Sequence, residues 1–199
     1  MSMLLKSATR LTLEKSVSSF NRSYAVGTNV LATPHSFVDQ FNKIHSSNQI
    51  FEGKKVVVVG IPGNNPIDTF HHVPSFTKNA DKIFAKGVDY IVCLSTYDVP
   101  ILRANRISLD PLNRVMIIIS TTSLILTILT HLSDTNAAFA KEYNLAEEKY
   151  LPTTNSNAPV DRFKRFALIV NNGKVVYEGL EKDQNECSAT NAEAVLKNL

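Results

Sequence analysis

Side chains able to do chemistry lie in three parts of the sequence: a turn-rich loop with the helix start after it, the start of a late strand, and a polar tail. In the first part, Asp68, His71 and His72 have a helical spacing that offers ligands to a metal ion. The competing interpretation is an ordinary helix start, in which Asp68 is the N-cap and its carboxylate accepts from free backbone amides. Both interpretations place Asp68 at a helix N-terminus, where a carboxylate is stabilised by about 0.3–1 kcal/mol.

Cys93 and Cys187 are the only cysteines in the chain. They are 94 positions apart, so they have no metal-type spacing, and a reducing compartment is compatible with both remaining thiols. Cys93 ends a β-branched run and is predicted to be a buried core residue. Cys187 lies in the polar tail, where we expect a more exposed thiol.

Several other kinds of site are not indicated. The segment Gly60–Gly63 lacks the Lys-Ser/Thr of a phosphate-binding loop, and chain order alone reveals no Ser-His-Asp arrangement. The net charge of +3 comes entirely from the first 24 residues, which leaves 17 basic and 17 acidic residues after them. We therefore expect no basic surface for nucleic acid and no bound cofactor.

The loop that carries Asp68 lies between a predicted strand and a predicted helix. Val56–Val59 is β-branched throughout and indicates a strand buried on both faces. Turn-forming residues fill 61–66, and an amphipathic helix pattern begins at His71. Its apolar face comprises Val73, Phe76, Ala80, Ile83 and Phe84. A second buried strand, Val88–Ser95, follows, so a right-handed crossover and a parallel strand pair are expected.

This strand, loop and helix resemble the type-5 branch of the peroxiredoxins, in which a strand is followed by P-G-A-F-T-P-T-C and then by H-[LIV]-P-G-[FY]. The matching positions are Pro62, Gly63, Pro66, His72, Val73, Pro74 and Phe76. Asp68 stands where the family has its peroxidatic cysteine, and the loop is one residue shorter than the pattern. Two later runs are similar to the same branch: K-G-V-D-x-I-V-C-L-S from Lys86 and R-x-K-R-F-A-L-I-V-x-x-G-x-V from Arg162.

The resemblance implies a thioredoxin-like α/β fold, a central mixed β-sheet flanked by helices. It also implies reduction of hydrogen peroxide and alkyl hydroperoxides, with thioredoxin or glutaredoxin/glutathione as donor, and a homodimer. In the family, Arg165 contacts the peroxidatic site, and Cys187 lies near the position of the resolving cysteine. The reaction needs a thiolate that becomes a sulfenic acid, which a carboxylate at residue 68 cannot supply.

Several interpretations of the altered site therefore stay open. The Asp68 carboxylate either caps the helix or pairs with Arg165 and holds the loop in one geometry. Cys187 is either a vestigial thiol or has taken over the peroxidatic role. The whole chain is either a peroxidase or a non-catalytic binding or regulatory subunit with the same fold.

Residues 115–132 include no Lys, Arg, Asp or Glu over 18 positions, close to the roughly 20 that span a bilayer. Six Ser or Thr argue against a membrane segment. We predict a buried strand near 125–131 preceded by an apolar insertion at about 107–124. A membrane-associated helix and an error in the coding sequence remain as alternatives. Ser133 or Asp134 is then expected to cap a short helix, Thr135–Tyr143.

Three further elements are expected. One short helix or turn is predicted between residues 25 and 53, from the spacing of Phe37, Phe41 and Ile44. A hairpin is predicted around Asn172-Gly173, because this pair readily adopts the positive φ values of a tight turn. The tail from residue 188 to 199 is predicted to close the domain as a helix.

The first 24 residues have the form of a mitochondrial presequence. They are rich in Ser and Thr, and their four basic residues oppose a single acid, Glu14. Arg22-Ser23-Tyr24 before Ala25 resembles a matrix-processing site. We therefore predict a matrix address over residues 1–24 and one domain over 25–199; the alternative is a disordered N-terminal arm.

Overall fold

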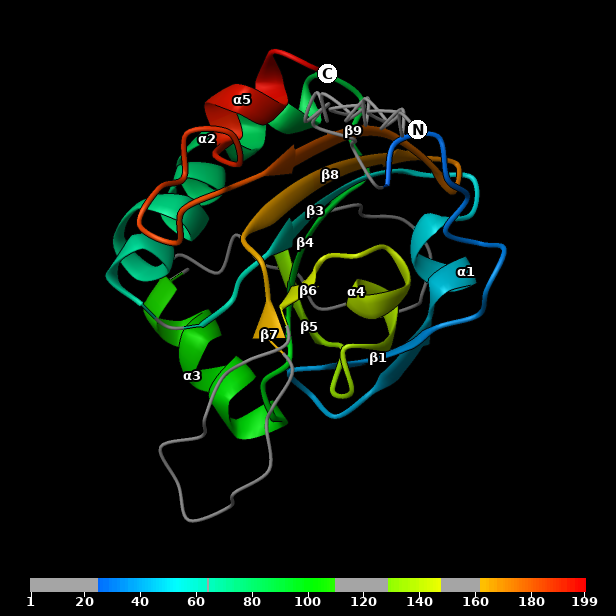
Figure 1. Cartoon of the computed structure of the whole chain (residues 1–199), viewed down its shortest axis with the longest axis horizontal. Helices are drawn as coiled ribbons and strands as arrows, with labels where there is room; N and C mark the ends of the chain where they lie inside the picture. Colours follow the sequence, from blue (N-terminus) through cyan, green and yellow to red (C-terminus); the bar gives the residue numbers. More distant parts are fainter. Residues whose placement is uncertain (1–24, 64, 110–128, 148–161) are drawn as a thin grey trace, which may run out of the picture.

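Seven strands form one mixed sheet in the order β2-β1-β5-β4-β3-β8-β9 (Figure 1). The computed structural model describes residues 25–63, 65–109, 129–147 and 162–199. The strands of the sheet are β1 Ser36–Asp39, β2 Ile44–Ser46, β3 Lys55–Gly60, β4 Tyr90–Ser95, β5 Leu129–Ser133, β8 Phe166–Asn171 and β9 Lys174–Leu180. Two short strands, β6 Ala146–Glu147 and β7 Arg162–Phe163, pair separately.

Helices cover both faces of the sheet, with α2, α3 and α5 on one side and α1 and α4 on the other (Figure 1). Their bounds are α1 Ser47–Phe51, α2 Val73–Phe84, α3 Val99–Leu109, α4 Ala138–Glu142 and α5 Ala192–Leu196, with a π-helical turn, η1 Asp68–His72, leading directly into α2. This arrangement is the thioredoxin-like α/β fold that the sequence predicted.

The centre of the sheet is the β3–β4 parallel pair, with β8 antiparallel on the other side of β3. Val56–Val59 is buried on both faces, as the unbroken β-branched run predicted. Gly60 ends the strand opposite Phe166, and a Cβ at residue 60 would lie 2.1 Å from that aromatic ring. A glycine is therefore required at the point where the chain enters the Asp68 loop.

Helix α2 covers the β3–β4 pair with the apolar face that the sequence predicted. Val73, Phe76, Ala80 and Ile83 are buried against the odd-numbered side of β3, and Phe84 packs against the same cluster. Each fully buried side chain of this size contributes about 1.5–3 kcal/mol, so this face fixes the helix, and the turn before it, to the sheet.

The hairpin of β8 and β9 is also as predicted. Asn172 and Gly173 have φ values of 46° and 79°, the left-handed conformation that a two-residue turn requires. The backbone amide of Asn172 donates to Lys54 O at 2.8 Å, which attaches the turn to the start of β3.

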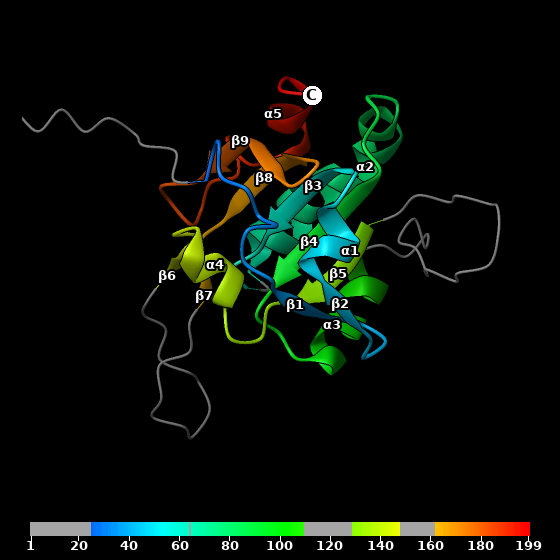
Figure 2. The same cartoon turned by 90° about the vertical axis from the view of Figure 1, so that its right-hand side faces the viewer.

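Of the two alternatives predicted from Phe37, Phe41 and Ile44, the helix is wrong and the turn is present, because this segment is the β1–β2 hairpin. Asp39 Oδ1 accepts from the amides of Phe41 and Lys43, and Asn42 has a φ of 68°, so the chain turns back instead of coiling. The helix of this region is α1, which starts with a capping box between Ser46 and Gln49. Figure 2 shows the hairpin at one edge of the sheet, near α3.

The chain after β4 differs from the prediction in part. It forms helix α3, which the sequence analysis did not foresee and which includes residues 107–109 of the predicted insertion. The described strand is β5, Leu129–Ser133, which overlaps the predicted strand at residues 129–131 and pairs in parallel with β4; residues 125–128 of that prediction lie outside the described residues. Residues 110–124 of the insertion and the predicted presequence lie outside the described residues. In the described part of the chain, no helix has the length and hydropathy needed to cross a membrane.

The last two helices are shorter than predicted. Helix α4 spans Ala138–Glu142 with Ala137 as its N-cap residue, whereas Ser133 or Asp134 was expected there; Asp134 Oδ2 still accepts from a first-turn amide, that of Ala140, at 3.1 Å. Helix α5 spans only Ala192–Leu196, and the preceding residues form turns that cross the start of α2.

Candidate active site

Asn65 fixes the start of the helical turn that carries Asp68. Asn65 Oδ1 accepts from the amide of Asp68 at 2.9 Å, and Pro66 follows at the first helical position, where its missing amide costs no hydrogen bond. The interpretation of Asp68 as the N-cap is therefore wrong. Asn65 has the capping role, and the Asp68 carboxylate is left to make other contacts.

Asp68 and Arg165 form a fully buried ion pair, with Arg165 Nε 2.8 Å from Asp68 Oδ1. The pairing proposed from the sequence is thus present. The same carboxylate oxygen lies 3.5 Å from His72 Nδ1, one helical turn later. Among the described residues, Asp68 Oδ2 has no hydrogen-bond partner. The carboxylate oxygen Oδ1 therefore faces both the Arg165 guanidinium and the His72 ring.

The other donors of Arg165 are largely satisfied by the surrounding chain. Nη1 donates to Gln184 O at 2.6 Å and to Glu186 O at 2.8 Å, and Nη2 donates to Asn65 Oδ1 at 3.3 Å. With the bond to Asp68, four of the five guanidinium N–H groups have protein acceptors. Little of the donor capacity of Arg165 is left for a bound oxygen ligand.

The loop from residue 181 to 190 covers this ion pair and is held closed by Glu181. Glu181 Oε1 accepts from the amides of Ala189 and Thr190 at 2.7 and 2.9 Å and from Thr190 Oγ1 at 3.1 Å. Thr190 O in turn accepts from His72 Nε2 at 3.1 Å. Because a carbonyl can only accept, His72 carries its proton on Nε2, and the loop is attached to both ends of the site.

Cys93 is buried in the same apolar cluster as the core-facing side chains of helix α2. It lies on β4 with an exposed fraction of 1%, as the sequence predicted. Burial raises the pKa of the Cys93 thiol well above its usual value, and the charge of Asp68 raises this pKa further. The thiol is therefore held in its unreactive protonated form.

Cys187 lies in the covering loop and is only partly exposed. Burial raises the pKa of its thiol. Arg165 acts in the opposite direction, but the carboxylates of Glu181, Asp68 and Glu193 raise the pKa again. Asp68 therefore acts electrostatically on both thiols of the chain, and in the same direction.

Comparison with known proteins identifies the family of this chain. The Redoxin family model matches residues 25–196. A putative peroxiredoxin of Malassezia furfur is 31% identical over 154 residues, which cover 77% of this chain and 80% of that protein. The chain belongs to the peroxiredoxin family.

Two further matches are a solved structure and a mitochondrial relative. The crystal structure of reduced Prx3 from Vibrio vulnificus in complex with H2O2 matches with a TM-score of 0.68 and 26% identity, covering 88% of this chain and 99% of that one. The mitochondrial peroxiredoxin-2F of Oryza sativa subsp. japonica is 50% identical over 50 residues, 25% of each chain. The peroxiredoxin is thus an antioxidant oxidoreductase by family, with a thioredoxin fold.

The residues that the sequence singled out come together only in part in this peroxiredoxin. Asp68, Arg165 and His72 form one buried cluster, with Cys187 in the loop above it, whereas His71 is exposed. In the described ranges, no three His, Cys, Asp or Glu side chains lie close enough to hold a metal ion.

Sequence reasoning missed Asn65 as the cap and Glu181 as the residue that closes the loop. The Asn-Pro dipeptide before Asp68 is a readable signal for a helix start. Nothing near Glu181 in the sequence indicates its partners eight and nine residues later.

Proposed function

We propose that this chain is a mitochondrial peroxiredoxin of the type-5 branch that acts in redox homeostasis. We further propose that, with aspartate at residue 68, this position cannot carry out the redox step of the family reaction. In that reaction a thiolate attacks a peroxide, the O–O bond breaks, and the sulfur becomes a sulfenic acid that a second thiol reduces through a disulfide. The donors would be thioredoxin or glutaredoxin/glutathione, and the chain would act as a homodimer. The observation that carries the proposal is the buried Asp68–Arg165 pair.

In this proposal, Asp68 and Arg165 take the place of the thiolate–arginine pair of the family. Neither side chain can be oxidised as a thiolate can. The Asp68 carboxylate has the charge that a thiolate would have, so Arg165 is satisfied and the loop is kept in one geometry. Any peroxide reduction by the unmodified chain must then use Cys187 or Cys93, and the pKa of each thiol is raised. We therefore expect slow turnover.

A second candidate function is a non-catalytic binding or regulatory subunit. It is favoured by the use of four Arg165 donors in contacts within the chain, because these donors are then unavailable to orient a peroxide. The two candidates differ in one measurable property, the reaction of a thiol of the mature protein with peroxide.

The test compares hydrogen peroxide consumption by residues 25–199 as the unmodified protein, as Cys187→Ser and as Asp68→Cys. We expect a low rate in the unmodified protein and at least a tenfold increase, roughly, in Asp68→Cys, where Arg165 favours the ionised thiol. Asp68→Ser is the matched control, because it removes the carboxylate without adding sulfur. If Asp68→Cys is no faster than Asp68→Ser, residue 68 is not the peroxidatic position.

The two cysteine variants then separate the two candidate functions. A rate in the unmodified protein that disappears in Cys187→Ser would make Cys187 the working nucleophile and exclude the non-catalytic subunit. A rate that is zero in the unmodified protein and appears only in Asp68→Cys would favour the subunit. Mass spectrometry of each variant after one equivalent of peroxide identifies the oxidised sulfur directly.

The mitochondrial part of the proposal is tested by import. It rests on the basic, Ser- and Thr-rich residues 1–24 and on the short match to a mitochondrial relative. The full chain should enter isolated mitochondria and become protease-protected, and a chain beginning at Ala25 should not. Import of the shortened chain would make the address assignment wrong.

A further inference from the structure

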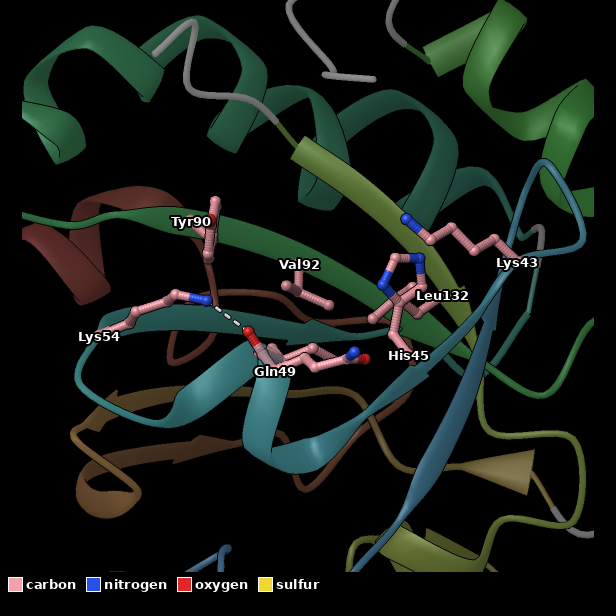
Figure 3. Close-up of a pocket in the computed structure, with 8 residues that line it drawn as sticks. Lys43, His45, Gln49, Lys54, Tyr90, Val92 and Leu132 are labelled. Carbon is pink, nitrogen blue, oxygen red and sulfur yellow. Dashed lines mark hydrogen bonds between the residues drawn. The ribbon is translucent and has the colours of Figure 1, made fainter. Parts of the chain in front are cut away.

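A cavity lies on the face of the sheet opposite Asp68. It has a volume of about 220 Å³ and lies between α1 and strands β4 and β5 (Figure 3). Val92 and Leu132, which line it, belong to the core layer on the α1 side, whereas the neighbouring Cys93 faces α2. The cavity is therefore separated from the Asp68–Arg165 pair by the sheet itself.

The cavity combines an apolar floor with a cationic rim. Val92, Leu132 and Ile50 form apolar parts of its lining. Figure 3 shows the side chains of Lys43 and Lys54 reaching over this floor from opposite sides. No Asp or Glu is among the lining residues, so the electrostatic preference of the cavity is for an anion.

The two lysines are not equally available to a ligand. The Lys54 ammonium donates to Gln49 O and lies 4.9 Å from the centroid of the Tyr90 ring. The Lys43 ammonium has no hydrogen-bond or ion-pair partner among the described residues. Lys43 therefore provides the more available charge.

Asp39, an acidic residue close to Lys43 in the chain, does not line the cavity, and its carboxylate oxygens have other partners. Asp39 Oδ2 lies 2.9 Å from Nε2 of His45, which lines the cavity, and Asp39 Oδ1 accepts from two backbone amides. Asp39 is thus shielded behind the imidazole. An anion in the cavity meets lysine and imidazole rather than carboxylate.

We propose that this cavity binds a monocarboxylate with an unbranched apolar tail of about six to eight carbons. A dry cavity of roughly 150 Å³ holds benzene with its six carbons, so about 220 Å³ accommodates approximately nine non-hydrogen atoms, the size of heptanoate. The tail covers the Val92–Leu132 floor, and the carboxylate pairs with Lys43 at the rim. This site is independent of peroxide chemistry and of residue 68.

The test is a titration of sodium heptanoate into residues 25–199, followed by amide chemical shifts in two-dimensional NMR. We expect saturable shifts confined to residues around 43–54 and 90–92, with a dissociation constant on the order of 1 mM for a ligand of this size. Heptan-1-ol, which lacks the charge, and inorganic phosphate, which lacks the tail, should each bind several-fold more weakly.

Variants identify the two halves of the site. Lys43→Gln should weaken heptanoate binding about three- to tenfold, because it removes one partly exposed charge pair. Lys174→Gln, an exposed lysine on β9 at the other edge of the sheet, is the matched control and should leave binding unchanged. Val92→Phe should fill the floor and abolish binding; if that variant does not fold, Lys43→Gln alone decides.

Three results would each overturn the proposal. The first is the absence of saturable shifts at 10-fold above the expected dissociation constant, roughly 10 mM heptanoate. The second is equal weakening by Lys43→Gln and Lys174→Gln, which would indicate non-specific attraction to positive charge. The third is equal affinity for phosphate or for heptan-1-ol, which would mean that either the apolar floor or the cationic rim plays no part.

Discussion

The two faces of the central sheet treat buried charge in opposite ways. On the α2 face, Asp68 and Arg165 are fully buried, and nearly every guanidinium donor has an acceptor within the chain. On the α1 face, Lys43 and Lys54 stand over an open cavity with an apolar floor, and the Lys43 ammonium has no hydrogen-bond or ion-pair partner among the described residues. The first face is closed on itself, and the second can accept a ligand.

This difference shows that a site can keep the residues of its family without keeping the capacity to bind a substrate. Satisfied donors stabilise a fold but cannot be offered to a substrate, so a site can keep its arginine and its helix and still have lost its chemistry. The contrast also predicts where substitutions are costly. Changes to the buried pair should affect stability, and changes to the lysines should affect binding alone.

The largest expected effect comes from breaking the buried pair. Arg165→Ala leaves the Asp68 carboxylate buried without a counter-charge, and we expect a loss of about 3–5 kcal/mol in the free energy of unfolding. Urea denaturation followed by circular dichroism measures this loss. Lys174→Ala, which removes an exposed lysine, should change the unfolding free energy by less than about 0.5 kcal/mol.

The double variant Asp68→Leu, Arg165→Met sharpens the result. Replacing both charges with apolar groups of similar size removes the unpaired carboxylate, so the double variant should be more stable than Arg165→Ala. If the double variant is as unstable as Arg165→Ala, the main loss comes from the backbone contacts of Arg165 to the covering loop rather than from its charge.

A second prediction concerns His131, a polar group on the α2 face that is not satisfied. His131 is paired with Cys93 in the β4–β5 register, and neither of its ring nitrogens has a hydrogen-bond partner among the described residues. Burial lowers the pKa of His131 to about 4, with Arg106 as a second cause. The unfolded chain binds a proton at His131 near pH 6.5, whereas the folded chain does so only near pH 4. The free energy of unfolding is therefore unaffected by this group above pH 6.5 and decreases as the pH falls from 6.5 towards 4.

We expect the unmodified protein to lose about 2 kcal/mol of unfolding free energy between pH 7.5 and pH 5 through this histidine alone. His131→Leu lacks the titrating group, so the pH dependence of the difference between the two proteins isolates the effect. A difference that stays constant from pH 7.5 to pH 5 would show that His131 does not remain neutral and buried.

The sequence predicted the elements whose signals are local. The β-branched run Val56–Val59, the apolar face of α2 and the Asn172-Gly173 turn were all found where expected, because each depends on its own residues. The family motif likewise brought Asp68 and Arg165 together across 97 positions. The fold class followed from these parts.

The failures occur where the spacing of apolar residues does not decide the conformation. Phe37 and Phe41 have helical spacing, but the Asp39 carboxylate binds two amides of the turn and favours a hairpin. Helix α3 has a weak apolar pattern, with Leu102 and Leu109 buried against the sheet. Asn65 caps the helix through the nearby amide of Asp68, for which Asn-Pro is a local signal, but no local pattern reports its second contact, with Arg165 100 positions later.

The smallest expected effect tests what keeps the α2 face closed. Glu181→Gln replaces a carboxylate that accepts from Ala189, Thr190 and the Thr190 hydroxyl with a neutral amide. Since charged acceptors make stronger hydrogen bonds, we expect a loss of about 1–2 kcal/mol in the stability of the loop. The same change removes one of the carboxylates that raise the pKa of the Cys187 thiol.

Both consequences act in the same direction on the reaction of Cys187 with 5,5′-dithiobis(2-nitrobenzoate). The loop opens more often and the thiol ionises at a lower pH, so Glu181→Gln should react about 3- to 10-fold faster at pH 7.5. Glu178→Gln on β9 is the matched control, because its carboxylate accepts from the amide of Ala25, away from the covering loop. Cys93 is buried and should stay unmodified in both variants until the protein unfolds.

Equal rates for the two glutamine variants would mean that Glu181 does not hold the loop. The closed state of this face would then depend on the two Arg165 contacts to Gln184 and Glu186.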